Sequence, residues 1–210
     1  MNVEIENLKL EILTMKIIRV HKKISLKVLQ EIGILLRNGG VIVYPTDTAY
    51  AMGGIFDNAK VIKKILQMKK RKDAKFTLIA SDIRQVEKLF SLNTFEKKLA
   101  KKYWPGPLSL VVSRKYAVRV PKNALARELA HIAQRPLIAS SANISGKDSP
   151  FSIREFLKQH KNNPNKPEYI LDYGKLIRKK PSTIVKVNTI GTIKIIRKGE
   201  IPMLHLLRPI

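Results

Sequence analysis

The sequence predicts a single α/β domain built around a mixed, strongly twisted sheet. Short apolar runs of strand length alternate along the 210 residues with segments whose apolar positions have helical spacing. We find no internal repeat and no linker that divides the chain, and its length suffices for one sizeable core. These observations favour one mixed α/β domain over two independent units.

Helices are predicted where apolar residues recur every three or four positions. In residues 26–37, leucine and isoleucine side chains share one helical face, and Asn38-Gly39-Gly40 ends the helix. The other predicted helices cover Ala59–Lys69, Ile83–Phe90, Thr94–Tyr103, 122–133 and Ser152–Gln159.

Strands are predicted for short apolar runs bounded by turn residues. Val41–Tyr44 is one such run, and Pro45 ends it into a polar loop. Residues 1–14 are expected to form an N-terminal extension, with Met15 as an alternative start and 15–210 as the domain. The other predicted strands are Met15–Val20, Phe76–Ala80, Leu108–Ser113, Ala117–Pro121, Leu137–Ser140, Tyr169–Asp172, Thr183–Val187 and Ile193–Arg197.

Composition excludes several classes of protein. The chain has no cysteine, which excludes disulfides, a thiolate nucleophile and a Cys-ligated zinc site. Its four histidines are scattered without ligand-like spacing, so no structural metal site is expected. No apolar run approaches the roughly 20 residues of a membrane helix, and the acidic start does not resemble a secretory signal. We therefore expect a cytoplasmic protein with no membrane partner.

The charge is the compositional outlier. Forty-one Lys and Arg residues against sixteen Asp and Glu residues give a formal net charge of +25. Such an excess suggests polyanionic partners, such as nucleotide phosphates or RNA. Most of the excess is lysine, which a lysine-rich proteome would also produce, so charge alone leaves both interpretations open.

Three polar motifs are candidates for ligand binding. Ser140–Gly146 follows an apolar run and supplies hydroxyls, an amide and a glycine that lets a ligand approach, although it could also be a capping turn. The basic run Lys69–Lys72 could reach a triphosphate or could be solvated. Thr46-Asp47-Thr48 follows a strand end, where α/β sheets commonly place ligand groups, and a capping turn is the alternative.

Arg119 stands inside an apolar strand. An unpaired guanidinium in that position would be costly, so it requires either a carboxylate ligand or a structural salt bridge. The sequence leaves this choice open.

These motifs together identify the chain as similar to the YrdC family of threonylcarbamoyl-AMP synthases. The resemblance covers about residues 25–200 and rests on four signatures in family order: Gly39–Thr48, Trp104–Leu108, Ser140–Gly146 and Ser182–Val185. It implies a single twisted α/β domain with a large, positively charged concave face. It also implies synthesis of threonylcarbamoyl-AMP from L-threonine, bicarbonate and ATP for N6-threonylcarbamoyladenosine modification of tRNA, downstream of which a threonylcarbamoyl-transferase complex acts.

The resemblance also assigns residues to the substrates. It implies Mg²⁺ with ATP, held mainly by the phosphates because the motifs contain few carboxylates beyond Asp47, and no catalytic nucleophile. Tyr50 is expected to line the pocket. The implied L-threonine-binding residues are Thr48, Arg119, Ala139 and Ser182, and the implied nucleotide-binding residues are Lys69, Arg71, Lys75, Ser141, Ser149 and Arg197.

Departures from the family pattern keep two alternatives open. Ala51, Lys72, Phe76 and Ala80 differ from the usual residues, and the segment 113–117 is shorter than usual. Phe76 resembles the YciO branch, which would make the chain a YciO-like protein acting on a related adenylate. The other alternative is an RNA-binding or ribosome-assembly factor, and direct binding of tRNA or double-stranded RNA is left open. An RNA binder needs surface cations, whereas Arg119 lies in an apolar strand.

Overall fold

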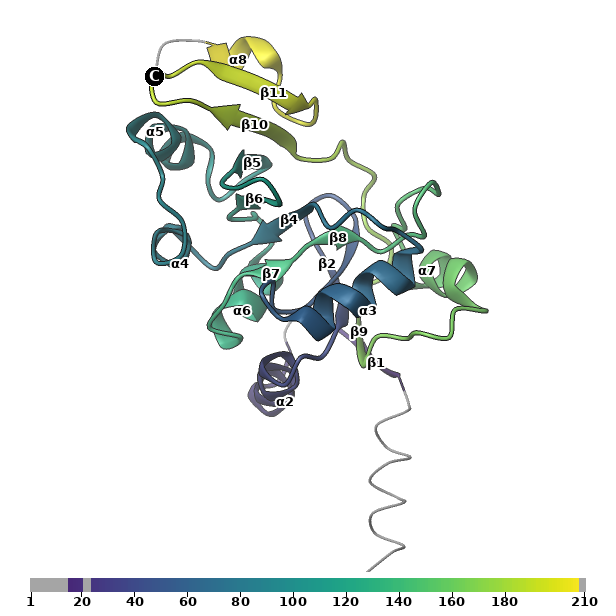
Figure 1. The fold of residues 1–210 in the computed structure, drawn as a ribbon. Coiled ribbons are helices and arrows are strands. Elements are labelled where there is room, and N and C mark those ends of the chain that lie inside the picture. Colours follow the sequence, from purple (N-terminus) through teal and green to yellow (C-terminus); the bar gives the residue numbers. More distant parts are fainter. Residues whose placement is uncertain (1–14, 21–23, 208–210) are drawn as a thin grey trace, which may run out of the picture.

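The computed structural model describes residues 15–20 and 24–207, and its strands form two mixed sheets (Figure 1). The predicted extension, residues 1–14, lies outside the described residues. The first sheet has the order β1 (Lys16–Arg19), β9 (Tyr169–Asp172), β2 (Ile42–Pro45), β3 (Tyr50–Gly53) and β8 (Ser140–Ser141). The second has the order β11 (Ile193–Arg197), β10 (Thr183–Val187), β5 (Leu108–Val111), β6 (Tyr116–Arg119), β4 (Phe76–Ile79) and β7 (Leu137–Ile138).

The helices begin at polar capping residues. The Asn58 side chain accepts the first free amides of α3, Asn123 does so for α6, and Asn93 and Glu96 form a reciprocal capping box at α5. The helices are α2 (Leu26–Arg37), α3 (Ala59–Lys69), α4 (Ile83–Glu87), α5 (Thr94–Tyr103), α6 (Ala124–Ile132), α7 (Ile153–His160) and α8 (Met203–Leu207).

The mixed α/β class is confirmed, while four details differ from the sequence prediction. The strands divide between two sheets instead of one. Residues 50–53 form β3, where a loop was expected, because a four-residue turn after β2 reverses the chain at once. The predicted strand Leu137–Ser140 is split at Ala139 into β7 and β8, which belong to different sheets. The helix α8 was not predicted.

The two sheets approach each other closely at β3 and β7. Gly53 of β3 lies so near the Ile138 carbonyl of β7 that a Cβ atom would come within 1.7 Å of that oxygen, which only glycine permits. Ala139 carries the chain from the second sheet to the first, and residues 173–182 carry it from β9 back to β10. The junction between the sheets is therefore lined by residues from several distant segments.

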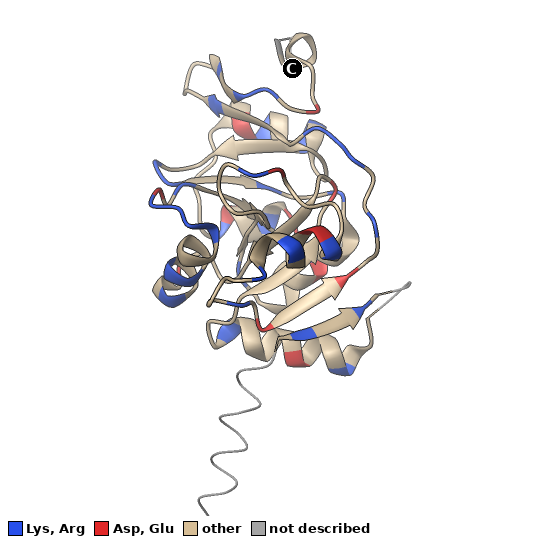
Figure 2. Cartoon of the chain, turned by 90° about the vertical axis from the view of Figure 1, so that its right-hand side faces the viewer, with Lys and Arg blue, Asp and Glu red and all other residues tan. Residues whose placement is uncertain are grey.

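Apolar side chains fill the space between the sheets and the helices. One cluster of fully buried residues includes Val43, Met52, Ile65 and Leu78, and it packs α3 against both sheets. Basic residues lie on helices, strands and connections alike and outnumber the acidic ones (Figure 2). A single concave basic face stays a prediction.

Candidate functional site

Two adjoining cavities open at the junction between the sheets. The first, called here the seam cavity, has a volume of about 360 Å³ and is lined by residues that include Thr48, Arg119, Ala139, Ser149 and Ser182. The second, the hairpin cavity, has a volume of about 400 Å³ and is lined by Arg71, Lys75 and the β5–β6 hairpin. Thr77, Ala139, Ser141 and Arg197 line both cavities. A ligand with two chemically different parts could occupy both.

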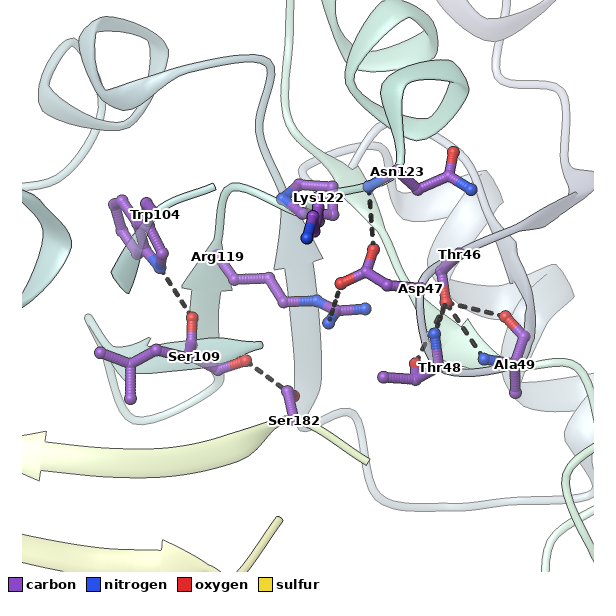
Figure 3. A network of polar contacts seen from close by, with 12 residues as sticks. Thr46, Asp47, Thr48, Ala49, Trp104, Ser109, Arg119, Lys122, Asn123 and Ser182 are labelled. Atoms are coloured by element: carbon purple, nitrogen blue, oxygen red, sulfur yellow. Dashed lines mark hydrogen bonds and ion pairs between the residues drawn. The ribbon is translucent and has the colours of Figure 1, made fainter. Parts of the chain in front are cut away.

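The turn after β2 places Thr48 at the seam cavity and Asp47 beside Arg119. The Thr46 hydroxyl donates to the Ala49 carbonyl at 2.7 Å and accepts the amides of Thr48 and Ala49 at 3.2 and 3.3 Å (Figure 3). The alternative of a structural turn is thus correct for Thr46. The same turn leaves Thr48 on the cavity wall.

Arg119 is both paired and incompletely satisfied. Its side chain is 4% exposed, and its Nη1 lies 3.2 Å from Asp47 Oδ2 (Figure 3). The other oxygen of Asp47 accepts the Asn123 amide at 3.1 Å, where α6 begins. Among the described residues, Nε and Nη2 of Arg119 have no hydrogen-bond partner, and Nε is fully buried. The salt bridge therefore uses only part of the guanidinium, and the remaining donors require an acceptor.

Ser182 and Arg197 form a second polar group on the cavity wall. Arg197 donates from Nε and Nη2 to the Ser182 carbonyl at 3.1 and 2.9 Å, and from Nη2 to the Ser182 hydroxyl at 2.9 Å. Burial, together with the nearby positive charge of Arg119, lowers the pKa of Arg197. Two guanidinium groups thus face a cavity in which an anion would be stabilised.

The hairpin cavity gathers cations on its side of the junction. Arg71 donates to the carbonyls of Asp73 and Lys75 at 2.6 and 2.7 Å and lies 4.7 Å from the ring centre of Phe76. This bracing orders the loop that carries Lys75, whose ammonium has no bonded partner among the described residues. Arg114 and Lys115 of the short β5–β6 hairpin complete the basic wall.

Lys69 is placed differently from the other predicted nucleotide contacts. Its side chain is buried and lines neither cavity. The ammonium donates to the Ser141 carbonyl at 2.5 Å, to the Asn143 carbonyl at 2.9 Å and to Asn143 Oδ1 at 3.4 Å. In this structure Lys69 therefore holds the loop after β8, and its contact with a nucleotide stays a prediction.

The backbone of Ala139 offers one group to a ligand. Its amide donates to the Thr77 carbonyl at 2.8 Å, so the carbonyl oxygen is the backbone atom available at the two cavities. Ser141 and Ser149 also line the site as expected from their positions in the sequence. Tyr50 does not line it. The Tyr50 hydroxyl instead donates to the Gly174 carbonyl and accepts the Tyr173 amide, both at 2.8 Å, and so anchors the connection between β9 and β10.

Two residues, Ser109 and Asp148, were missed in the sequence, whereas Asn143 supplies the amide of the predicted motif Ser140–Gly146. Ser109, fully buried in β5, lies with its hydroxyl 3.0 Å from that of Ser182 (Figure 3). Asn143 accepts from Lys69 and from the Ser141 hydroxyl, and Asp148 lines the seam cavity. A polar residue inside an otherwise apolar strand was the available signal for Ser109, as it was for Arg119.

The described residues contain no group of three or more histidine, cysteine or acidic side chains that could hold a metal ion. Asp47 is occupied by Arg119 and the Asn123 amide, which leaves Asp148 as the carboxylate on the wall of the seam cavity. No helix in the described part of the chain is both long and apolar enough to cross a membrane.

The fold and the paired cavities define a mixed α/β protein with an arginine-lined site at the junction of two sheets. The family model that matches residues 34–199 is that of the Sua5, YciO and YrdC proteins, described as telomere recombination. The chain belongs to this family, as its motifs predicted.

Relatives of known name and structure agree with this assignment. The chain is 32% identical to a putative threonylcarbamoyl-AMP synthase of Methanocaldococcus jannaschii over 92% of this chain and 96% of the relative. It is 29% identical to Pyrococcus abyssi Sua5, whose crystal structure with L-threonine superposes with a TM-score of 0.79 over 91% of this chain and 61% of that one. Escherichia coli YciO shares the fold, with a TM-score of 0.75 at 22% identity over 89% and 96% of the two chains.

Proposed function

We propose that this chain is a threonylcarbamoyl-AMP synthase, which makes the adenylate from L-threonine, bicarbonate and ATP for tRNA modification. The observation that carries the proposal is Arg119, a buried guanidinium with two nitrogen atoms that lack a partner among the described residues, and which lines a cavity with Thr48, Ala139 and Ser182. The names of the curated relatives and the binding of L-threonine by P. abyssi Sua5 support it. The chain spans 53% of the length of the curated P. abyssi relative, so the proposal concerns the part shared with it.

L-Threonine fits the seam cavity in one orientation. Its carboxylate accepts from Arg119 and Ser182, because these groups supply donors at one end. The Ala139 carbonyl and the Thr48 hydroxyl supply acceptors for the amino group and the side-chain hydroxyl.

ATP then occupies the hairpin cavity, with its α-phosphate near the shared wall of Thr77, Ala139, Ser141 and Arg197. Attack of the threonine nitrogen on the carbon of bicarbonate forms the carbamate and releases water. A carbamate oxygen then bonds to the α-phosphorus, and the bond from that phosphorus to pyrophosphate breaks. Arg71, Lys75 and Arg197 stabilise the charge that develops on the phosphates, so the chain needs no nucleophile of its own.

Mg²⁺ fits this site as an ion carried by ATP. Such an ion is commonly held by phosphates, waters and one or two carboxylates, and Asp148 is the carboxylate that the seam cavity offers. When bound with ATP, it would neutralise part of the phosphate charge.

The RNA-binding alternative accounts less well for the site. A buried guanidinium in a cavity that Ser182 also lines does not reach the backbone of a folded RNA, which surface lysines and arginines contact. The net charge of +25 supports an additional contact with tRNA. We also propose that a threonylcarbamoyl-transferase complex uses the adenylate in the cytoplasm. A YciO-like protein would instead act on a related adenylate.

One assay tests the proposal. The purified chain is incubated with ATP, bicarbonate, Mg²⁺ and labelled L-threonine, and both pyrophosphate and the labelled adenylate are measured. We expect equal amounts of the two products, and none when bicarbonate is left out. ATP turnover that incorporates no threonine would contradict the proposal and favour the YciO-like alternative.

A further inference from the structure

Ser109 carries a hydroxyl but lines neither cavity. Its side chain is fully buried, and its position is fixed on both sides. The Trp104 indole donates to the neighbouring Leu108 carbonyl at 2.7 Å, and Ser109 pairs with Ile184 where β5 meets β10 (Figure 3). The hydroxyl of Ser109 has one partner among the described residues, the Ser182 hydroxyl at 3.0 Å.

The direction of that hydrogen bond follows from burial. If Ser182 donated to Ser109, the Ser109 proton would be left in the interior without an acceptor, which buried hydroxyls avoid. If Ser109 donates to Ser182, every buried donor of the pair is satisfied. The second arrangement is therefore the stable one.

This direction determines which hydrogen bonds the Ser182 hydroxyl can make to a ligand. Its hydroxyl oxygen also accepts from Arg197 Nη2 at 2.9 Å, so both lone pairs are occupied. Its own proton then has the seam cavity as its remaining direction, since Ser182 lines that cavity. Toward a ligand, Ser182 can donate a hydrogen bond but cannot accept one.

We infer that Ser109 is a positioning residue that makes Ser182 a dedicated donor, so that this end of the seam cavity selects a carboxylate. The inference rests on the proposed function, in which L-threonine is the ligand. Arg119 presents donors as well, so a ligand there needs two acceptor oxygens. A carboxylate has two such oxygens, whereas a carboxamide has one and would direct an N–H group at a donor.

The test compares L-threonine with L-threoninamide by calorimetry. In the unaltered chain we expect a strong preference for L-threonine, because the amide loses both charge and one acceptor. In Ser109→Ala, no donor holds the Ser182 proton toward the cavity, so the hydroxyl can turn its proton into the vacated side and offer a lone pair to the amide N–H. The ratio of the two dissociation constants should therefore fall about two- to tenfold, the effect of one neutral hydrogen bond.

Matched variants separate this role from a loss of structure. Ser109→Thr keeps the hydroxyl and should restore the ratio, whereas Thr183→Val removes a neighbouring buried hydroxyl that bonds Ile201 and should leave it unchanged. In a Ser182→Ala background, adding Ser109→Ala should have no further effect on the ratio.

Two results would contradict these claims, and they distinguish a failure of the inference from a failure of the proposed function. If the unaltered chain binds L-threonine and Ser109→Ala, still folded, keeps the full ratio, Ser109 does not orient Ser182 and only this inference fails. If the unaltered chain does not bind L-threonine, the proposed function fails as well.

Discussion

Arg119 and Lys69 are buried to the same depth, at 4% and 3% exposure, but their donors meet different partners. The Lys69 ammonium has three hydrogens and three oxygen partners, all from Ser141 and Asn143. Arg119 has one carboxylate, Asp47, and two nitrogen atoms without a partner among the described residues. The fold satisfies one cation, and the other keeps nitrogen atoms for which the described residues supply no acceptor.

This comparison distinguishes a buried cation that stabilises the fold from one that is available to bind a ligand. Burial alone does not do so, because both side chains avoid water. The number of donors left unpaired does, since an unsatisfied buried donor costs free energy until a ligand supplies the acceptor. The substitutions below test this distinction, beginning with the largest expected effect.

Replacing Arg119 by alanine should abolish most of the affinity for L-threonine. Hydrogen bonds to charged groups contribute about 1.5–3 kcal/mol each, so we expect the dissociation constant to rise about 10- to 100-fold. Calorimetry measures this effect, and thermal unfolding shows whether the fold survives the loss of the Asp47 partner. Arg119→Lys keeps the charge but loses the planar arrangement of donors, and it should recover only part of the affinity. A folded alanine variant with unchanged affinity would remove Arg119 from the site.

Replacing Lys69 by methionine should act on the fold instead. The substitution leaves the buried oxygens of Ser141 and Asn143 without their donor, and we expect the free energy of unfolding to fall by about 1–3 kcal/mol. Denaturant titration measures it. The affinity for L-threonine should change far less than in Arg119→Ala, because Lys69 lines neither cavity. If the variant kept its free energy of unfolding but lost its affinity for ATP, the result would support the contact between Lys69 and phosphate that the sequence predicted.

The pH dependence of stability should reveal the same lysine. Burial, followed by the charge of Arg71, lowers the pKa of Lys69 from 10.5 to about 7. Between these values the unfolded chain binds more protons than the folded one, so the free energy of unfolding should rise with pH, by at most about 1.4 kcal/mol per pH unit. The useful window is pH 7 to 9, because burial also raises the pKa of Tyr44 and makes its ionisation oppose folding at higher pH. Subtracting the pH dependence measured for Lys69→Met isolates the contribution of Lys69. If the two proteins showed the same dependence of unfolding free energy on pH, the lowered pKa of Lys69 would be refuted.

The sequence predicted most helices and strands because their apolar residues repeat with a clear period. It could not predict the division into two sheets, because Ala139, where the chain crosses between them, carries no local signal. It placed Arg119 and Ser182 near each other through family motifs, and the structure brings both to one cavity. Lys69 was assigned to the nucleotide by the family pattern, and the carbonyl groups some 70 residues away that accept from it are invisible in the sequence. The role of Ser109 likewise depends on a partner from another strand.

Replacing Ser182 by alanine should have a smaller effect than replacing Arg119. It removes one neutral hydroxyl, whose hydrogen bond contributes about 0.5–1.5 kcal/mol, so the dissociation constant for L-threonine should rise about two- to twelvefold. Arg197 should stay in place, because two of its three bonds go to the Ser182 carbonyl, which the variant keeps. Calorimetry with L-threonine and with ATP separates the outcomes. An equal loss for both ligands would mean that Arg197 moved and that the hydroxyl is structural.

Replacing Lys75 by alanine should have the smallest effect, because its exposed ammonium is a cation of a third kind, unpaired and in water. Exposed charge pairs contribute little, so we expect the Michaelis constant for ATP to rise about two- to fivefold with the affinity for L-threonine unchanged. Lys72→Ala is the matched control, since Lys72 is an exposed lysine three residues before Lys75 and lines neither cavity. If Lys75 instead contacts RNA, the variant would keep its Michaelis constant for ATP and show a shallower dependence of RNA binding on salt. Pyrophosphate release and RNA binding, measured on both variants, decide which polyanion this lysine meets.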